Sequence, residues 1–283
     1  MNLLILGSIG MAGHTITLYM KEKGYNVTAV TLTPFPYCNN IVCDLCNLNI
    51  LEDTLKKDDY TAVINCVGIL NTDAEINKSK AVFLNSYLPH ILCEITKNMK
   101  TKVIHMSTDC VFSGDTGNYK ENSLRDGITF YDRSKSLGEI ENKKDLTFRN
   151  SIIGPDMNIN GIGLFNWFMK QSGTINGYNK AIWTGVTTLT LAKAMERAII
   201  DNLCGLYHLV NNKEINKYNL LQLFNKYYKN NNIIINENSS VSINKSLINT
   251  RNDFNFKVPS YEEMVQEMKE WIYSHKEFYP HYF

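Results

Sequence analysis

The stretch LLILGSIGMAGH, residues 3–14, decides the fold of this chain of 283 residues. The apolar run LLIL is typical of a buried strand, and Gly7, Gly10 and Gly13 follow it in the pattern G-x-x-G-x-x-G, opening a helix that runs to Gly24. Glycine permits a tight turn and a close backbone approach to a diphosphate, whose charge the helix N-terminus stabilises. The stretch therefore predicts a nucleotide-binding unit.

Strands and helices alternate beyond this unit. The patterns predict strands over residues 25–32, 62–67, 102–106 and 146–149, and helices over residues 81–98 and 131–141. Residues 187–210 are expected to form a helix followed by a strand, and this strand is expected to join the same sheet. This alternation predicts an α/β fold, a Rossmann-like doubly wound parallel sheet.

The composition limits the partners. The 29 basic and 28 acidic residues nearly cancel, and no long run of one sign occurs, so we expect neither a nucleic acid nor a membrane as partner. No apolar stretch approaches the roughly 20 residues of a membrane span. The chain enters a strand with no export signal, so we expect a cytoplasmic location.

Seven scattered cysteines indicate reduced thiols rather than disulfides. Cys38, Cys43 and Cys46 have the C-x4-C-x2-C spacing of some iron–sulfur sites, but such a site needs a fourth thiolate. We favour a short strand that runs into a turn at Asp44, and we expect no metal site.

The end of the second strand does not identify a cofactor. An acidic residue there would hold the ribose hydroxyls of NAD, and an arginine would accept the phosphate of NADP. This chain has Val30, Thr31, Leu32 and Thr33 instead, so NADH and NADPH both stay open. Asp44 could contact the adenine end or cap a turn.

Polar residues follow the strand VIHM directly. Ser107, Thr108 and Asp109 are expected at the mouth of a site, because ligands of parallel sheets bind beyond the carboxyl ends of the strands. Tyr131 and Lys135 lie four residues apart, on one face of a helix. A cation near a phenol lowers its pKa, so this pair predicts a tyrosine that passes a proton at neutral pH.

These motifs resemble the extended short-chain dehydrogenase/reductase superfamily, and within it the dTDP-4-dehydrorhamnose reductase family. The segments that carry the resemblance are GSIGMAG (7–13), STDCVFSG (107–114) and YDRSK (131–135). It is good over residues 1–155 and thinner afterwards. Ile152 departs from the family, which commonly has an aromatic residue there, so the exact sugar stays open.

The resemblance implies roles for individual residues. Thr108, Tyr131 and Lys135 would be catalytic, and Asn85 would sit on a helix beneath the site. Substrate contacts would come from Thr108, Asp109 and Ile152; we add Arg251 as a candidate partner of a diphosphate. The expected cofactor-binding residues are Gly7, Ile9, Gly10, Met11, Ala12, Gly13, Thr31, Asp44, Leu45, Cys66, Val67, Gly68, Ser107, Tyr131 and Lys135.

The resemblance also implies a smaller C-terminal α/β substrate-binding domain. Residues 1–153 and 186–210 would form the dinucleotide-binding domain, and residues 154–185 and 211–283 the substrate-binding domain. Within the latter, the stretch YYKNNNIIINENSS (227–240) indicates a solvated loop. The aromatic residues Trp167, Phe168, Tyr178 and Trp183 are expected to fill a core.

The activity implied is hydride transfer from NADPH or NADH to the 4-keto group of a nucleotide-activated 6-deoxyhexose, with Tyr131 as proton donor, in polysaccharide sugar biosynthesis. A homodimer is left open. Two alternatives remain: an epimerase or dehydratase on the same scaffold, for which Asp109 beside Thr108 would serve, and a non-catalytic regulatory subunit that binds NADP. The first alternative would turn over without consuming cofactor.

Overall fold

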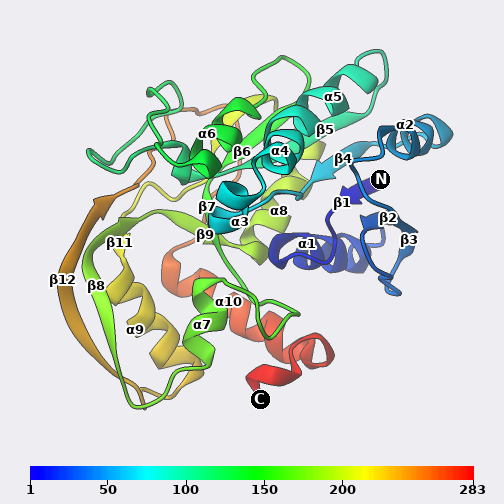
Figure 1. The fold of residues 1–283 in the computed structure, drawn as a ribbon. Coiled ribbons are helices and arrows are strands. Elements are labelled where there is room, and N and C mark those ends of the chain that lie inside the picture. Colours follow the sequence, from blue (N-terminus) through cyan, green and yellow to red (C-terminus); the bar gives the residue numbers. More distant parts are fainter.

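The structure is a computed structural model that describes residues 1–283, and a seven-stranded parallel sheet forms its centre (Figure 1). The strand order is β10-β6-β5-β4-β1-β2-β3, so the chain starts in the middle and winds outward in both directions. This order confirms the predicted Rossmann-like, doubly wound fold. The strands are β1 (Asn2–Leu6), β2 (Asn26–Thr31), β3 (Asn39–Val42), β4 (Ala62–Asn65), β5 (Lys102–Ser107), β6 (Leu146–Arg149) and β10 (Gly205–His208).

Helices cover both faces of this sheet. Leu3 and Ile5 of β1 point into a core shared with α1 and α8, whereas Leu4 and Leu6 point into a second core shared with α2 and α5. The period-two alternation of a strand buried on both faces produces this division. The helices of this part are α1 (Met11–Glu22), α2 (Leu48–Lys57), α3 (Asn71–Ile76), α4 (Lys78–Ala81), the π-helix η1 (Val82–Tyr87), α5 (Leu88–Ile95), the 3-10 turn η2 (Asp109–Val111), α6 (Phe130–Leu137) and α8 (Thr188–Ile200).

A second, three-stranded sheet has the order β11-β8-β12 and lies apart from the first (Figure 1). The division into two domains stays our proposal; it is supported by β10, which joins the main sheet, and by β8 and β12, which do not. The remaining elements are β7 (Ser151–Ile153), α7 (Leu164–Met169), β8 (Thr174–Trp183), β9 (Gly185–Thr187), β11 (Ile215–Asn216), α9 (Lys217–Tyr228), β12 (Ile234–Asn244), α10 (Tyr261–Ser274), η3 (Lys276–Phe278) and η4 (Pro280–Tyr282).

The predicted loop over residues 227–240 is wrong. Its whole second half, residues 234–240, belongs to β12, which pairs in parallel with β8 from Ile234 onward. Ile233 and Ile235 are buried, while Ile234 is 63% exposed, and the asparagine and serine side chains lie on an open edge. Pairing with β8 overrides the low strand propensity of asparagine, which is why composition alone misjudged this stretch.

The aromatic residues between β7 and β9 are only partly core. Phe168 and Trp183 are buried as expected, but Trp167 and Tyr178 are each 40% exposed. Two of these aromatic side chains therefore pack in a core, and the other two are partly exposed to solvent.

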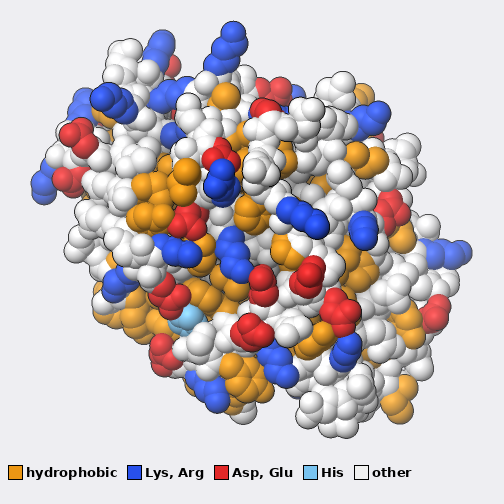
Figure 2. Space-filling view, turned by 180° about the vertical axis from the view of Figure 1, so that it is seen from behind, with side chains coloured by type: hydrophobic (Ala, Val, Ile, Leu, Met, Phe, Trp, Pro, Cys, Tyr) orange, Lys and Arg blue, Asp and Glu red, His pale blue; other side chains and the backbone are white.

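The surface carries mixed charge. On the face shown in Figure 2, basic and acidic side chains are interspersed with apolar ones, so that face offers no patch of a single sign. Among the helices, none has the length and apolar character needed to cross a bilayer.

Candidate active site

A continuous cleft lies beyond the carboxyl ends of the parallel strands. It consists of two adjoining cavities, with empty volumes of about 660 and 920 Å³, that share Gly10, Cys66, Val67 and Gly68. One is lined further by Gly7, Ile9, Val30, Thr31, Leu32, Cys43, Asp44, Leu45, Lys80 and Leu84. The other is lined further by Met11, Ala12, Leu70, Met106, Ser107, Thr108, Tyr131, Lys135, Asn150, Ser151 and Ile152.

The glycine-rich turn forms the floor where the two cavities meet. Gly7 has φ +83°, and a Cβ on Gly13 would lie 2.1 Å from the carbonyl oxygen of Gly7, so neither position accepts a side chain. No side chain caps the N-terminus of α1. A ligand can therefore approach the backbone of this turn closely, and the N–H groups at the start of α1 are free. Both features suit the diphosphate of a dinucleotide.

The ends of β2 and β3 line the first cavity. Asn40 donates from Nδ2 to Thr31 Oγ1 (2.7 Å), and the Thr31 hydroxyl donates to the carbonyl of Thr33 (2.7 Å). Asp44 accepts from the amide of Cys46 (2.9 Å), a hydrogen bond that lowers its pKa. Asp44 thus caps a turn and also lines the cavity, and the nearby Lys80 adds a cation. This cavity therefore has an acidic group that could contact ribose hydroxyls, as for NAD, and a cation that could contact a phosphate, as for NADP.

Helix α6 carries Tyr131 and Lys135 on the face toward the cleft. Its N-terminus is fixed by a reciprocal capping box between Thr129 and Asp132. At its C-terminus Gly138 packs so closely on η1 that a Cβ there would lie 1.9 Å from the Asn85 carbonyl oxygen. Local sequence signals therefore determine where the helix begins, and a close contact determines how deep it lies.

Lys135 is buried, and two residues of β5 contact its ammonium group. Its Nζ donates to the carbonyl oxygen of Met106 (2.6 Å) and lies 3.4 Å from His105 Nε2. Burial lowers the pKa of Lys135 to about 8 and that of His105 well below its usual value, so His105 is neutral and its Nε2 can accept from the ammonium. Asn65 lies 3.2 Å from His105 Nδ1. Sequence reasoning missed this support; the histidine within the apolar strand VIHM was its only signal.

The prediction that Lys135 lowers the pKa of Tyr131 is wrong for the structure. Burial raises the pKa of the phenol above its usual range, the nearby Cys110 raises it further, and a hydrogen bond with Thr108 lowers it only in part. The ammonium of Lys135 is engaged with Met106 instead. In the structure, Tyr131 is therefore a neutral phenol, the form that donates a proton.

Thr108 lies beside Tyr131 at the end of β5. Its hydroxyl donates to Asp109 Oδ1 (3.2 Å) and accepts from the amide of Cys110 (3.2 Å). Ser107 lines the cleft and donates to Glu139 (2.6 Å). Asp109 is buried outside the cleft lining, and burial raises its pKa while Lys217 and Lys245 oppose the rise. Thr108 thus faces the cleft and Asp109 lies behind it.

Asn85 ties the elements around the site together. Its amide accepts from the Ile69 amide (2.9 Å) and donates to the Ile69 carbonyl (2.9 Å) and to Ser134 Oγ (3.0 Å). It lies on the π-helix η1, a form often found at functional sites. Asn85 therefore joins the loop after β4 to α6, directly beneath the cleft.

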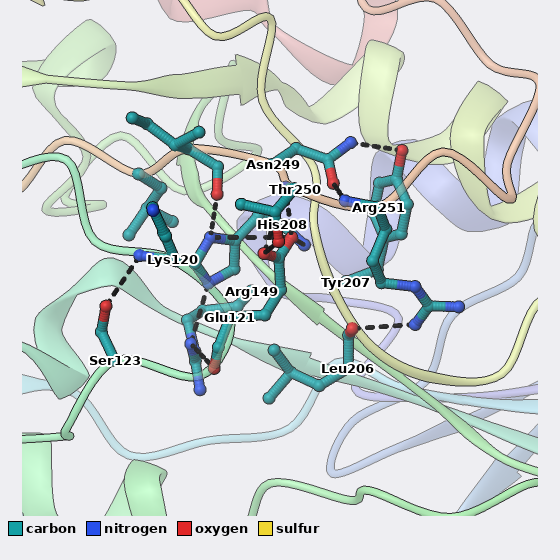
Figure 3. Close-up of polar contacts among 12 residues, drawn as sticks. Lys120, Glu121, Ser123, Arg149, Leu206, Tyr207, His208, Asn249, Thr250 and Arg251 are labelled. Atoms are coloured by element: carbon teal, nitrogen blue, oxygen red, sulfur yellow. Dashed lines mark hydrogen bonds and ion pairs between the residues drawn. The ribbon is translucent and has the colours of Figure 1, made fainter.

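Arg251 is not brought to the cleft. Its guanidinium donates to the carbonyls of Cys204 (2.8 Å) and Leu206 (2.9 Å) and pairs with Asp253. Figure 3 shows the contact with Leu206, beside Tyr207. These carbonyls lie at the amino end of β10, opposite the edge that forms the cleft. Because Arg251 lies at the opposite edge of the sheet, the prediction that it binds a diphosphate in the cleft is wrong.

The structure also adds residues that sequence reasoning did not single out. Leu70, Met106, Asn150 and Ser151 line the second cavity, and Lys80 and Leu84 line the first. They come from loops, strand ends and helix faces whose approach to the cleft depends on the tertiary fold. No group of three or more histidine, cysteine or acidic residues is arranged to hold a metal ion, and all seven cysteines are free thiols.

The sheet, the glycine-rich turn and the cleft define the class of Rossmann-like proteins that bind a ligand across the carboxyl ends of the strands. Within that class, the chain belongs to the family described as the RmlD substrate binding domain, whose model matches residues 1–270.

Curated relatives support this membership at modest identity. A probable low-salt glycan biosynthesis reductase of Haloferax volcanii is 30% identical over 139 residues, which are 48% of this chain and 46% of that protein. A dTDP-4-dehydrorhamnose reductase of Shigella flexneri is 26% identical over 222 residues, 74% of this chain and 72% of that protein. Three further matches, to sugar-nucleotide reductases of other bacteria, cover 44–45% of the relatives' length, so the chain spans about half the length of most of the curated relatives that it matches.

Solved structures share the fold. A dTDP-4-dehydrorhamnose reductase of Bacillus anthracis, solved in complex with NADP, has a TM-score of 0.79 at 20% identity and covers 94% of this chain and 98% of its own. A hypothetical dTDP-4-dehydrorhamnose reductase of Sulfolobus tokodaii has a TM-score of 0.77 at 23% identity, with coverages of 93% and 98%.

Proposed function

We propose that the protein is an NAD(P)H-dependent reductase of a nucleotide-activated 4-keto-6-deoxyhexose. The observation that carries the proposal is the single cleft that brings the glycine-rich turn, Thr108, Tyr131 and Lys135 together. Relatives named as reductases of dTDP-linked sugars support the substrate class. A bound nicotinamide would supply the hydride.

The protein's own residues would orient the sugar and move the proton. Tyr131, a neutral buried phenol, gives its proton to the carbonyl oxygen as negative charge develops there. The Thr108 hydroxyl, which lies beside Tyr131, donates to the same oxygen. Lys135, held by Met106 and His105, would bind the ribose of the nicotinamide.

The substrate's diphosphate needs a cation other than Arg251. Lys217, the first residue of α9, is partly exposed, lies 4.9 Å from the centroid of Trp183 and interacts electrostatically with Asp109. Since Asp109 follows Thr108, this lysine lies near the end of β5 that carries the site. We propose that Lys217 binds the anionic part of the sugar nucleotide.

The dehydratase alternative is less well supported. It requires an acid that reaches the substrate beside the threonine, and Asp109 lies behind Thr108 rather than in the cleft lining. An intact Thr108, Tyr131 and Lys135 also count against a purely regulatory subunit. The reductase accounts for all of these residues together.

The test is cofactor oxidation with NADH and NADPH against dTDP-, UDP- and GDP-linked 4-keto-6-deoxy sugars made in place by their dehydratases. Consumption with one of the sugars identifies substrate and cofactor together. If no sugar is consumed while dinucleotide binding is measurable, the reductase proposal is wrong and the epimerase or regulatory reading takes its place.

A further inference from the structure

A chain of buried hydrogen bonds joins the C-terminal part of the protein to the glycine-rich turn. The indole Nε1 of Trp271, in α10, lies 3.2 Å from the hydroxyl of Tyr279. This hydroxyl lies 2.8 Å from His14 Nε2, and His14 Nδ1 lies 2.9 Å from the carbonyl oxygen of Gly10. Tyr279 and His14 are both fully buried. Residues 265 positions apart therefore meet at the start of α1.

The two ends of this chain fix the direction of each hydrogen bond. An indole N–H can only donate, so Trp271 donates to the Tyr279 hydroxyl. A backbone carbonyl can only accept, so the ring proton of His14 lies on Nδ1 and points to Gly10. His14 Nε2 is then an acceptor, to which the Tyr279 hydroxyl donates; Thr15 Oγ1 lies farther away, at 3.4 Å. Burial lowers the pKa of His14 to about 4, so the ring stays neutral and Nε2 keeps its lone pair.

The Gly10 carbonyl belongs to a peptide of the cleft. Gly10 immediately precedes α1, and both Gly10 and Met11 line the cleft. Their shared peptide carries the Gly10 carbonyl on one side and the Met11 N–H, one of the free donors of the helix, on the other. If the proton of His14 moved to Nε2, Nδ1 would turn a lone pair toward that carbonyl and repel it. The orientation of this peptide therefore depends on the tautomer of His14, which the Tyr279 hydroxyl selects.

We propose that His14, Tyr279 and Trp271 are positioning residues of the dinucleotide site, because together they hold the peptide between Gly10 and Met11 in place. None of the three lines the cleft, so they act through the turn and not by contact with the ligand. The inference rests on the proposed function, since it requires a dinucleotide on the turn. It makes the C-terminal segment necessary for full dinucleotide affinity.

The test measures dissociation constants for oxidised NAD and NADP by calorimetry. Tyr279→Phe should raise the constant about fivefold, within the range of one hydrogen bond. His14→Asn keeps an N–H donor close to the position of Nδ1 and has no tautomer to select, so adding Tyr279→Phe to it should cause no further loss. Tyr228→Phe is the matched control. It removes a hydroxyl that donates to the Val265 carbonyl (3.1 Å) between α9 and α10, and it should bind the dinucleotide as the wild type does.

Nitrogen NMR of protein labelled at its histidines reads the tautomer directly. The His14 signal, identified by its loss in His14→Asn, should show the proton on Nδ1 in the wild type and partly on Nε2 in Tyr279→Phe. A merely structural role of Tyr279 would not cause this change. A proton on Nε2 in the wild type would overturn the inference, even if Tyr279→Phe does not fold.

The remaining outcomes distinguish a failure of the inference from a failure of the proposed function. Unchanged dinucleotide affinity in Tyr279→Phe would overturn the inference, and so would an equal loss in the wild-type and His14→Asn backgrounds. The expected affinities, together with no cofactor oxidation by any 4-keto-6-deoxy sugar, would support the inference and overturn the reductase. A wild type that binds no dinucleotide would overturn both.

Discussion

Asn85 is predicted to connect stability to the geometry of the site. Asn85→Ala removes three hydrogen bonds, two to the backbone of Ile69 and one to Ser134. At about 1 kcal/mol for each, the free energy of unfolding should fall by about 3 kcal/mol. Because Ser134 lies between Tyr131 and Lys135 on α6, the variant should also weaken dinucleotide binding and turnover.

A matched control separates these two effects. Asn225, in α9, joins the backbone of Ile233 through two similar hydrogen bonds, 2.7 and 3.1 Å long. Asn225→Ala should cost about 2 kcal/mol on the same scale, with no change in dinucleotide affinity.

Urea titration measures the stability of both variants, and calorimetry measures their dinucleotide affinity under conditions where both are folded. A stability loss below about 1 kcal/mol for Asn85→Ala would refute the reasoning about its hydrogen bonds. Equal weakening of dinucleotide binding by both variants would refute the specific role of Asn85 beneath the cleft.

Three further changes have definite expected outcomes. Tyr131→Phe should lower turnover by about 100-fold or more while the dinucleotide dissociation constant stays within about twofold, measured by steady-state kinetics and calorimetry. Lys217→Met should raise KM for the sugar nucleotide about tenfold, whereas Lys226→Met, on the exposed part of the same helix, should not. Burial lowers the pKa of His14 from 6.5 to about 4, so the unfolded chain binds the extra proton, and stability should fall by at least about 2 kcal/mol as the pH drops from about 6.5 to 5, seen by urea titration, because the buried His105 and His208 add losses of the same sign.

Sequence patterns predicted the parts of the molecule whose causes are local. The turn at Gly7 and Gly13 needs glycine because of backbone conformation and contact, and it opens a helix as expected. The residues after VIHM lie at the end of a strand, and Tyr131 and Lys135 lie one helical turn apart. Each of these features is decided by a few neighbouring residues, so a single sequence shows it.

The remainder depended on contacts between distant segments. Arg251 carries the charge expected of a diphosphate ligand, but only the fold shows that it donates to the carbonyls of Cys204 and Leu206. Figure 3 shows the contact with Leu206. Lys135 was expected to act on Tyr131, whereas the carbonyl of Met106 holds its ammonium. The polar strand β12 exists because β8 offers it an edge. None of these partners is near in sequence.

Transfer of deuterium tests the central claim most directly. NADPH or NADH that carries deuterium at the transferable position of the nicotinamide is incubated with the 4-keto-6-deoxy sugar nucleotide, and the product is examined by NMR. The account predicts one deuterium at C4 of a 4-hydroxy sugar for each cofactor oxidised, and loss of that signal in Tyr131→Phe. A converted sugar without deuterium, with the cofactor unconsumed, would contradict it.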